Sequence, residues 1–139
     1  MARTIDAAEI LGLSLRASQG IIQEIRAGLP TKSLSLIETR LGATKAELAA
    51  VLFIPERTLQ RRRTSHARLR SDESDRLYRL AKVVAHAIMA IGDEERAMRW
   101  LREPNRALGG VTPLSLLDTE AGTEAVEDSL GAIQYGGVA

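Results

Sequence analysis

The segment TKAELAAVLFIPERTLQRRR, residues 44–63, decides the fold that the sequence predicts. Thr44 and Glu47 have the spacing of a capping box, in which the hydroxyl and the carboxylate accept hydrogen bonds from backbone N–H groups at the start of a helix. A second helix is expected to begin near Glu56, because the preceding residues FIP interrupt the helical pattern. Two helices joined by a tight turn within about twenty residues form a helix-turn-helix motif.

Apolar positions inside this motif predict how its two helices pack. Ala49 falls where the helices cross and where a larger side chain would clash, and Leu59 points from the second helix into the core. Two positions depart from the usual pattern. Phe53 stands where such turns often have a glycine, which tolerates a positive φ, and Arg62 stands where an apolar residue is usual. These two departures leave the geometry of the turn open.

Charge is distributed unevenly along the chain, although the net charge is only +1. Residues 56–70 contain six arginines and one glutamate, a net +5, whereas residues 104–139 contain one arginine and five acids, a net −4. Clustered arginines favour a polyanion, because binding releases counterions from its phosphates. The acidic segment is unsuited to nucleic acid and is expected to have a different partner.

The second helix of the motif predicts which residues contact DNA. With Leu59 pointing inward, residues two positions away on either side lie on the opposite face, since consecutive helical residues are about 100° apart. The residues expected to contact base edges in a major groove are Arg57, Thr58, Gln60 and Arg61. The residues expected to contact phosphates are Arg62, Arg63, Arg68 and Arg70. The alternative is a solvated basic face that binds no ligand.

Helical periodicity dominates the rest of the chain and predicts an all-α protein with one core of ordinary size. The expected central helix carries one apolar stripe, formed by Leu77, Leu80, Ala81, Val84, Ile88 and Ile91. Two small helices after Pro104 hold too little apolar area for a core of their own, so this segment should lean on the body or on another protein. If the stripe and Trp100 complete the main core, a chain ending at Glu103 should stay folded.

Several classes of function are disfavoured by the residues present. The chain has no cysteine, which suits a reducing cytosol, and no signal peptide or membrane anchor is readable, so we expect a soluble cytoplasmic protein. His86 is expected to be a packed core residue and His66 lies in the basic loop, so no metal site is predicted. No activated nucleophile, acid–base carboxylate pair or phosphate-binding loop is found, so an enzyme is disfavoured.

Four stretches together resemble the Xre-type antitoxins (Xre/ParS family) of bacterial type II toxin–antitoxin pairs: RTLQRRR, RLRSDESDRLYRLAKV, WLREPNRALGGVTPLSLLDTEAG and VEDSLGAIQYG. The usual partner of this family is a RES-domain toxin, which consumes NAD or transfers from it. The resemblance implies an N-terminal dimerisation part over residues 1–30, a helix-turn-helix core over residues 31–103 and a small toxin-binding domain over residues 104–139. It also implies that the pair represses its own promoter DNA and that the antitoxin needs no cofactor.

The resemblance extends to a toxin-binding signature within residues 104–122. Its Leu108, Leu116 and Leu117 are expected to build the core of the small domain. The acidic helix and the tail are better placed for contact with a toxin pocket lined by basic residues. The residues expected to bind toxin are Asn105, Gly109, Gly110, Glu124, Glu127, Asp128, Gln134, Tyr135, Gly136 and Gly137.

Two further expectations concern assembly and the alternative function. A homodimer is expected, because helix-turn-helix proteins usually read paired half-sites, and Ile21, Ile22 and Ile25 form an apolar patch for its interface. The alternative function is a stand-alone helix-turn-helix repressor with a C-terminal dimerisation or effector domain. A toxin that is encoded alongside or co-purifies would discriminate between the two.

Overall fold

The computed structural model describes residues 4–14 and 18–136, and its elements are helices. They are α1 (Ala7–Ile10), α2 (Ser18–Ala27), α3 (Thr31–Leu41), α4 (Lys45–Leu52), α5 (Glu56–Ser65), α6 (Ser71–Ile91), α7 (Glu94–Arg102), the 3₁₀ turns η1 (Arg106–Leu108) and η2 (Leu114–Leu116), and α8 (Glu120–Gly136). Over these residues the only β-type pairing is an isolated bridge between Asn105 and Val111. The expected all-α fold is confirmed. Among the described helices, none has both the length and the apolar composition needed to cross a bilayer.

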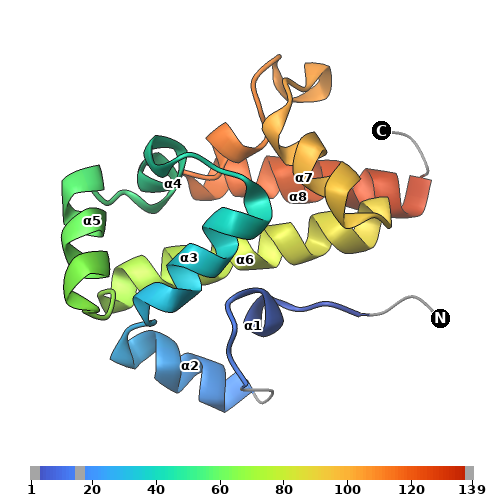
Figure 1. Cartoon of the computed structure of the whole chain (residues 1–139). Coiled ribbons are helices and arrows are strands. Elements are labelled where there is room, and N and C mark those ends of the chain that lie inside the picture. The colour runs from blue at the N-terminus through green and yellow to red at the C-terminus, as the bar shows by residue number, and fades with distance from the viewer. Residues whose placement is uncertain (1–3, 15–17, 137–139) are drawn as a thin grey trace.

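Helix α6 is the axis of the molecule, and Figure 1 shows it running through the middle with the other helices around it. The predicted apolar stripe is buried at Leu77, Leu80, Ala81 and Val84 and partly buried towards the C-terminal end of the helix. Val83, which lies off the stripe, is also buried, at 1% exposure. Helix α6 is therefore covered on more than one face by other helices of the same chain.

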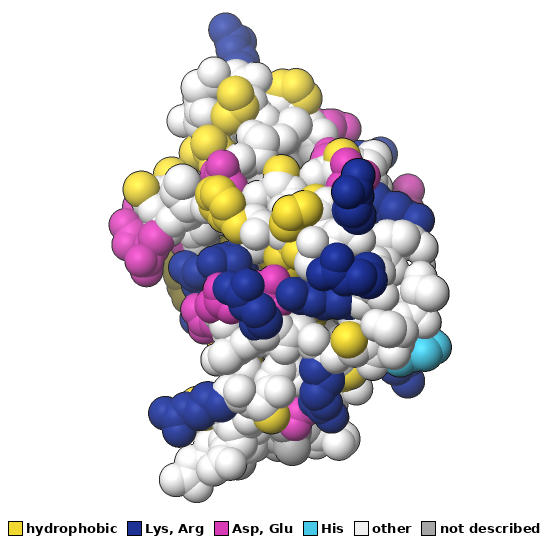
Figure 2. Space-filling view, turned by 90° about the vertical axis from the view of Figure 1, so that its left-hand side faces the viewer, with side chains coloured by type: hydrophobic (Ala, Val, Ile, Leu, Met, Phe, Trp, Pro, Cys, Tyr) yellow, Lys and Arg dark blue, Asp and Glu magenta, His cyan; other side chains and the backbone are white. Residues whose placement is uncertain are grey.

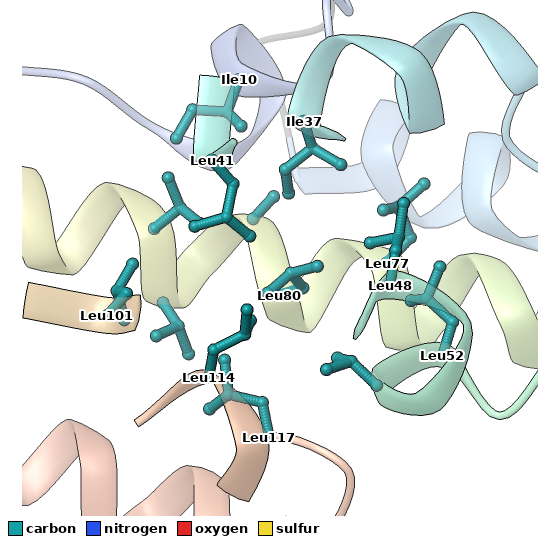
Figure 3. Close-up of a cluster of buried hydrophobic side chains, with 14 of the residues drawn as sticks. Ile10, Ile37, Leu41, Leu48, Leu52, Leu77, Leu80, Leu101, Leu114 and Leu117 are labelled. Atoms are coloured by element: carbon teal, nitrogen blue, oxygen red, sulfur yellow. The ribbon is translucent and has the colours of Figure 1, made fainter. Parts of the chain in front are cut away.

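One hydrophobic core joins the two ends of the sequence. Figure 3 shows Ile10, Leu80, Leu101 and Leu114 in one cluster of buried side chains, to which four different elements contribute. Residues of α8 belong to the same cluster, and Leu130 is fully buried. The expectation that the C-terminal segment leans on the body is confirmed. A chain ending at Glu103 would expose the apolar surface of α6 that α8 covers, so the structure argues against its staying folded.

Of the leucines expected to form a core in the C-terminal segment, Leu117 is buried, and Leu114, which was not expected, is buried as well. Leu108 and Leu116 are only partly buried, whereas Leu114 is buried at 2% exposure and Leu117 at 9%. The reason is the tight 3₁₀ turn η2, which directs Leu114 inward. Gly122 allows α8 to approach this turn, because a Cβ atom there would lie 1.9 Å from the carbonyl oxygen of Leu116.

The helix-turn-helix forms over α4 and α5, as predicted. Thr44 caps α4 by accepting a hydrogen bond from the Glu47 N–H at 3.0 Å, and Glu47 accepts one from the Thr44 N–H at 2.8 Å. The latter bond is the main reason that the pKa of Glu47 is lowered, and Arg102 contributes as well. In the turn, Phe53 adopts the left-handed conformation with φ of 55°. The turn geometry is thus kept without glycine, at a cost of about 1–2 kcal/mol in strain.

Candidate nucleic-acid and protein interfaces

Helix α5 lies at one edge of the molecule and presents most of its surface to solvent (Figure 1). Leu59 is its one fully buried residue, at 3% exposure. Arg57, Gln60 and Arg61 are exposed, and Thr58 is half-buried. Arg57 and Arg61 therefore lie opposite the residue that anchors the helix, and Thr58 and Gln60 flank them on its two sides.

Two arginines of this face are without a charge partner among the described residues. Among the residues that the structure describes, no ion pair involves Arg57 or Arg61. Figure 2 looks at this end of the molecule and shows Lys and Arg side chains spread over it, with acidic side chains between some of them. Two free guanidinium groups on one exposed helix face are suited to bidentate contacts with bases or phosphates.

The other four arginines of the basic stretch are held by carboxylates of the same chain. The ion pairs are Arg62 with Glu73, Arg63 with Glu38 at 2.6 Å, Arg68 with Glu24 at 3.0 Å, and Arg70 with Asp72 at 2.7 Å. The hydrogen bond from Arg70 also holds the pKa of Asp72 below its usual value. Because these four arginines are paired with carboxylates of the same chain, the surface around α5 carries less positive charge than the +5 counted along residues 56–70.

One further residue on the exposed face was not predicted. Thr64 is exposed and lies three residues after Arg61 and seven after Arg57, a spacing that places all three on the same side of a helix. Its hydroxyl donates a hydrogen bond to the carbonyl oxygen of Gln60 at 3.0 Å, which leaves the oxygen able to accept from a ligand. The same spacing was readable in the sequence.

The predicted toxin-binding segment begins with a loop that protrudes from the molecule (Figure 1). Asn105 organises it: the side-chain oxygen accepts from the Ala107 N–H at 2.9 Å, and the backbone pairs with Val111. Gly109 and Gly110 are exposed and both have positive φ, with nothing within 4 Å of an added Cβ atom. Asn105 thus shapes the loop, and the two glycines form its accessible tip.

Helix α8 carries the remaining predicted toxin-binding residues, in two groups. Glu124, Asp128 and Tyr135 are exposed, the tyrosine at 86%. Glu127 and Gln134 instead contact His86 of α6: a Glu127 oxygen lies against Nδ1, and the Gln134 Oε1 lies 3.1 Å from Nε2.

This arrangement corrects two expectations. His86 is a half-buried polar link between α6 and α8 and is not a packed core residue. The expected tail is helical through Gly136, whereas Gly137 lies outside the described residues. No group of three or more His, Asp or Glu side chains in the described part of the chain could hold a metal ion.

Helix α5 and the C-terminal end of α8 contact α6 towards its opposite ends. Arg62 of α5 reaches Glu73 in the first turn of α6, and Gln134 near the end of α8 reaches His86. Glu73 and His86 are thirteen residues apart in one helix, which corresponds to about 20 Å at 1.5 Å per residue. These two contacts are therefore about 20 Å apart along α6.

Comparison with known protein families finds two domains in this chain. Residues 20–82 match the antitoxin Xre-like helix-turn-helix domain, and residues 85–136 match the antitoxin Xre/MbcA/ParS C-terminal toxin-binding domain. The two matches meet inside α6, so one continuous helix serves both domains.

Similar proteins agree with these domain matches. The chain is 34% identical over 127 residues to a protein named Antitoxin Xre from Yersinia enterocolitica, which covers 89% of this chain and 86% of that protein. It is 34% identical over 110 residues to an Antitoxin Xre from Photorhabdus laumondii, and this match covers 78% of this chain and 74% of that protein. It is also 28% identical over 124 residues to a protein from Sphingobium named Prs ADP-ribosylating antitoxin, and this match covers 83% of this chain and 78% of that protein. With its helix-turn-helix and its toxin-binding domain, the chain belongs to the Xre antitoxin family.

Proposed function

We propose that this antitoxin neutralises a RES-domain toxin through its C-terminal segment and represses its own operon through α5. The observation that carries the proposal is the separation of the two surfaces along α6. The free arginines Arg57 and Arg61 lie towards one end, and the exposed end of α8 lies towards the other. A cytoplasmic protein built in this way can hold a toxin and promoter DNA in one complex.

The toxin-binding surface combines the glycine loop with the exposed side of α8. Its exposed members are Gly109, Gly110, Glu124, Asp128, Gln134, Tyr135 and Gly136. Asn105 and Glu127 are partly buried, and each uses a side-chain oxygen for a contact within the chain, whereas Gln134 is exposed and places its Oε1 against His86. The acidic side chains suit a basic toxin pocket. A RES toxin uses NAD, and the name of the Sphingobium relative refers to ADP-ribosylation, a reaction for which NAD is the usual donor.

The DNA-binding surface requires two copies of the chain. A helix-turn-helix dimer reads two half-sites about one turn of DNA apart. Ile22 of α2 is 45% exposed, while Ile21 and Ile25 are half-buried, so α2 offers an apolar contact for a second copy. We infer a homodimer through α2 that places two α5 helices in successive major grooves.

Co-expression with the neighbouring open reading frame tests the toxin half of the proposal. That reading frame alone should stop growth and deplete NAD, and this chain should restore both. Deleting residues 135–139 removes no described buried residue, so the shortened chain should fold and still bind the toxin while NAD turnover returns. Unchanged inhibition after this deletion would refute a role for the tail.

Matched variants separate the two activities. Arg57→Ala with Arg61→Ala should lower discrimination between operator and random DNA by about 1–3 kcal/mol per lost base contact, and toxin inhibition should not change. Tyr135→Ala should weaken toxin inhibition and leave DNA binding intact. If the neighbouring product is harmless and the chain still binds its upstream DNA, a stand-alone repressor is the correct function.

A further inference from the structure

Helix α5 itself has one buried apolar anchor. Leu59 is its only buried side chain, while Ile54 and Leu69 are buried in the segments before and after the helix. One apolar point within the helix leaves its rotation about its own axis weakly defined. Arg62 and Arg63 follow three and four residues after Leu59 and flank the buried side. Each reaches a carboxylate on a different element: Arg62 pairs with Glu73 of α6, and Arg63 pairs with Glu38 of α3.

Both ion pairs are largely withdrawn from solvent. The side chains of Arg62 and Glu73 are 15% and 5% exposed, and those of Arg63 and Glu38 are 16% and 21% exposed. Arg63 places two nitrogens on the two carboxylate oxygens of Glu38, at 3.4 and 2.6 Å. Its Nε is buried without a hydrogen-bond partner. Because both terminal nitrogens of Arg63 are held by Glu38, a DNA phosphate could not bind them in the same bidentate way unless this pair first broke.

We propose that Glu38 and Glu73 are positioning residues for DNA recognition, which they support by holding Arg63 and Arg62 and so fixing the orientation of α5. The inference rests on the proposed DNA-binding function. Together with Leu59, the two pairs attach α5 at three points, to the core, to α3 and to α6. Three points define both the tilt and the rotation of a helix. The direction of Arg57 and Arg61 towards the groove then depends on two acidic residues outside the DNA-facing surface.

This reading and direct phosphate contact make opposite predictions for Glu38→Gln. If Arg63 contacts phosphate, removing a negative charge beside it should strengthen DNA binding, because repulsion falls and the guanidinium is released. If Glu38 positions α5, the same change should weaken DNA binding, because the base contacts of Arg57 and Arg61 lose their alignment. The sign of the change in affinity therefore distinguishes the two roles.

The experiment uses the full chain and a duplex from its own upstream region, with affinity measured by fluorescence anisotropy at low salt. Glu38→Gln should lower the affinity at least about fivefold, as expected for the loss of one good base contact. Glu56→Gln is the matched control: Glu56 is exposed on α5, so neutralising it should leave affinity equal or higher. The exchange Arg63→Glu with Glu38→Arg should restore binding, because it rebuilds the pair in reverse.

The outcomes separate this inference from the proposed function. A wild-type chain that binds no DNA at low salt overturns the DNA-binding proposal, and this inference falls with it. A wild-type chain that binds, together with a Glu38→Gln variant that binds equally or more tightly, overturns the inference alone. The inference is also overturned if the variant with the exchanged pair does not bind DNA although far-ultraviolet circular dichroism shows that it is folded. In that case the carboxylate introduced at position 63 would repel a phosphate that Arg63 contacts in the wild type.

Discussion

Replacing Leu130 by alanine should destabilise the DNA-binding helices together with the C-terminal segment. Leu130 of α8 is fully buried and belongs to the same cluster as Leu48, Leu59 and Leu80. The substitution leaves a cavity in a core that α4, α5, α6 and α8 share. Unfolding of α8 should therefore not occur separately from unfolding of the helix-turn-helix.

The size of the effect can be estimated from the burial. A fully buried leucine replaced by alanine costs about 2–5 kcal/mol in the free energy of unfolding. For 139 residues, an unfolding entropy of about 2.1 cal/mol/K per residue gives roughly 0.29 kcal/mol/K. The melting temperature should then fall by about 7–17 °C.

Thermal unfolding by circular dichroism, combined with DNA binding over the same temperatures, provides the assay. The wild type and Leu130→Ala should each show one transition, and DNA binding should be lost within it. Tyr135→Ala is the control on the same helix, because its side chain is 86% exposed and its replacement should change stability by less than about 0.5 kcal/mol. Two transitions, of which only one shifts, would refute the shared core.

Three further predictions concern a cap, a close contact and the dimer. Because the Thr44 N–H lowers the pKa of Glu47 from its usual 4.5, the carboxylate stabilises the folded state above that pH. The cost of Glu47→Gln, about 0.5–1 kcal/mol for this part-exposed group, should therefore shrink in urea titrations as the pH falls through the lowered pKa. Gly122→Ala should cost about 1–3 kcal/mol in the same assay, since its Cβ would collide with the Leu116 carbonyl, whereas a cost near zero would contradict this packing. Ile22→Glu should yield monomers in sedimentation velocity at concentrations where the wild type is dimeric, and unchanged sedimentation would exclude α2 as the interface.

The helices and the motif were predictable because their signals are local. Thr44 and Glu47 are three residues apart, and the spacing of apolar residues around Leu59 indicates which side of α5 faces the core. The conformation of Phe53 could not be predicted from local signals of this kind. Its left-handed conformation follows from the buried contacts of Leu52 and Ile54 on either side, which hold the turn although the residue itself disfavours it.

The all-α class, the helix-turn-helix and the acidic C-terminal segment were therefore determined by the sequence alone, while the tertiary structure decided which charges are available. Arg62, Arg63 and Arg68 were expected to face DNA, but their carboxylate partners stand 11, 25 and 44 residues away in the chain. His86 likewise meets Glu127 across 41 residues. A net charge counted along the sequence takes no account of where the charged groups lie in space. Ion pairing depends on the distance between the groups, and that distance is fixed only when α2, α3, α6 and α8 pack in the folded protein.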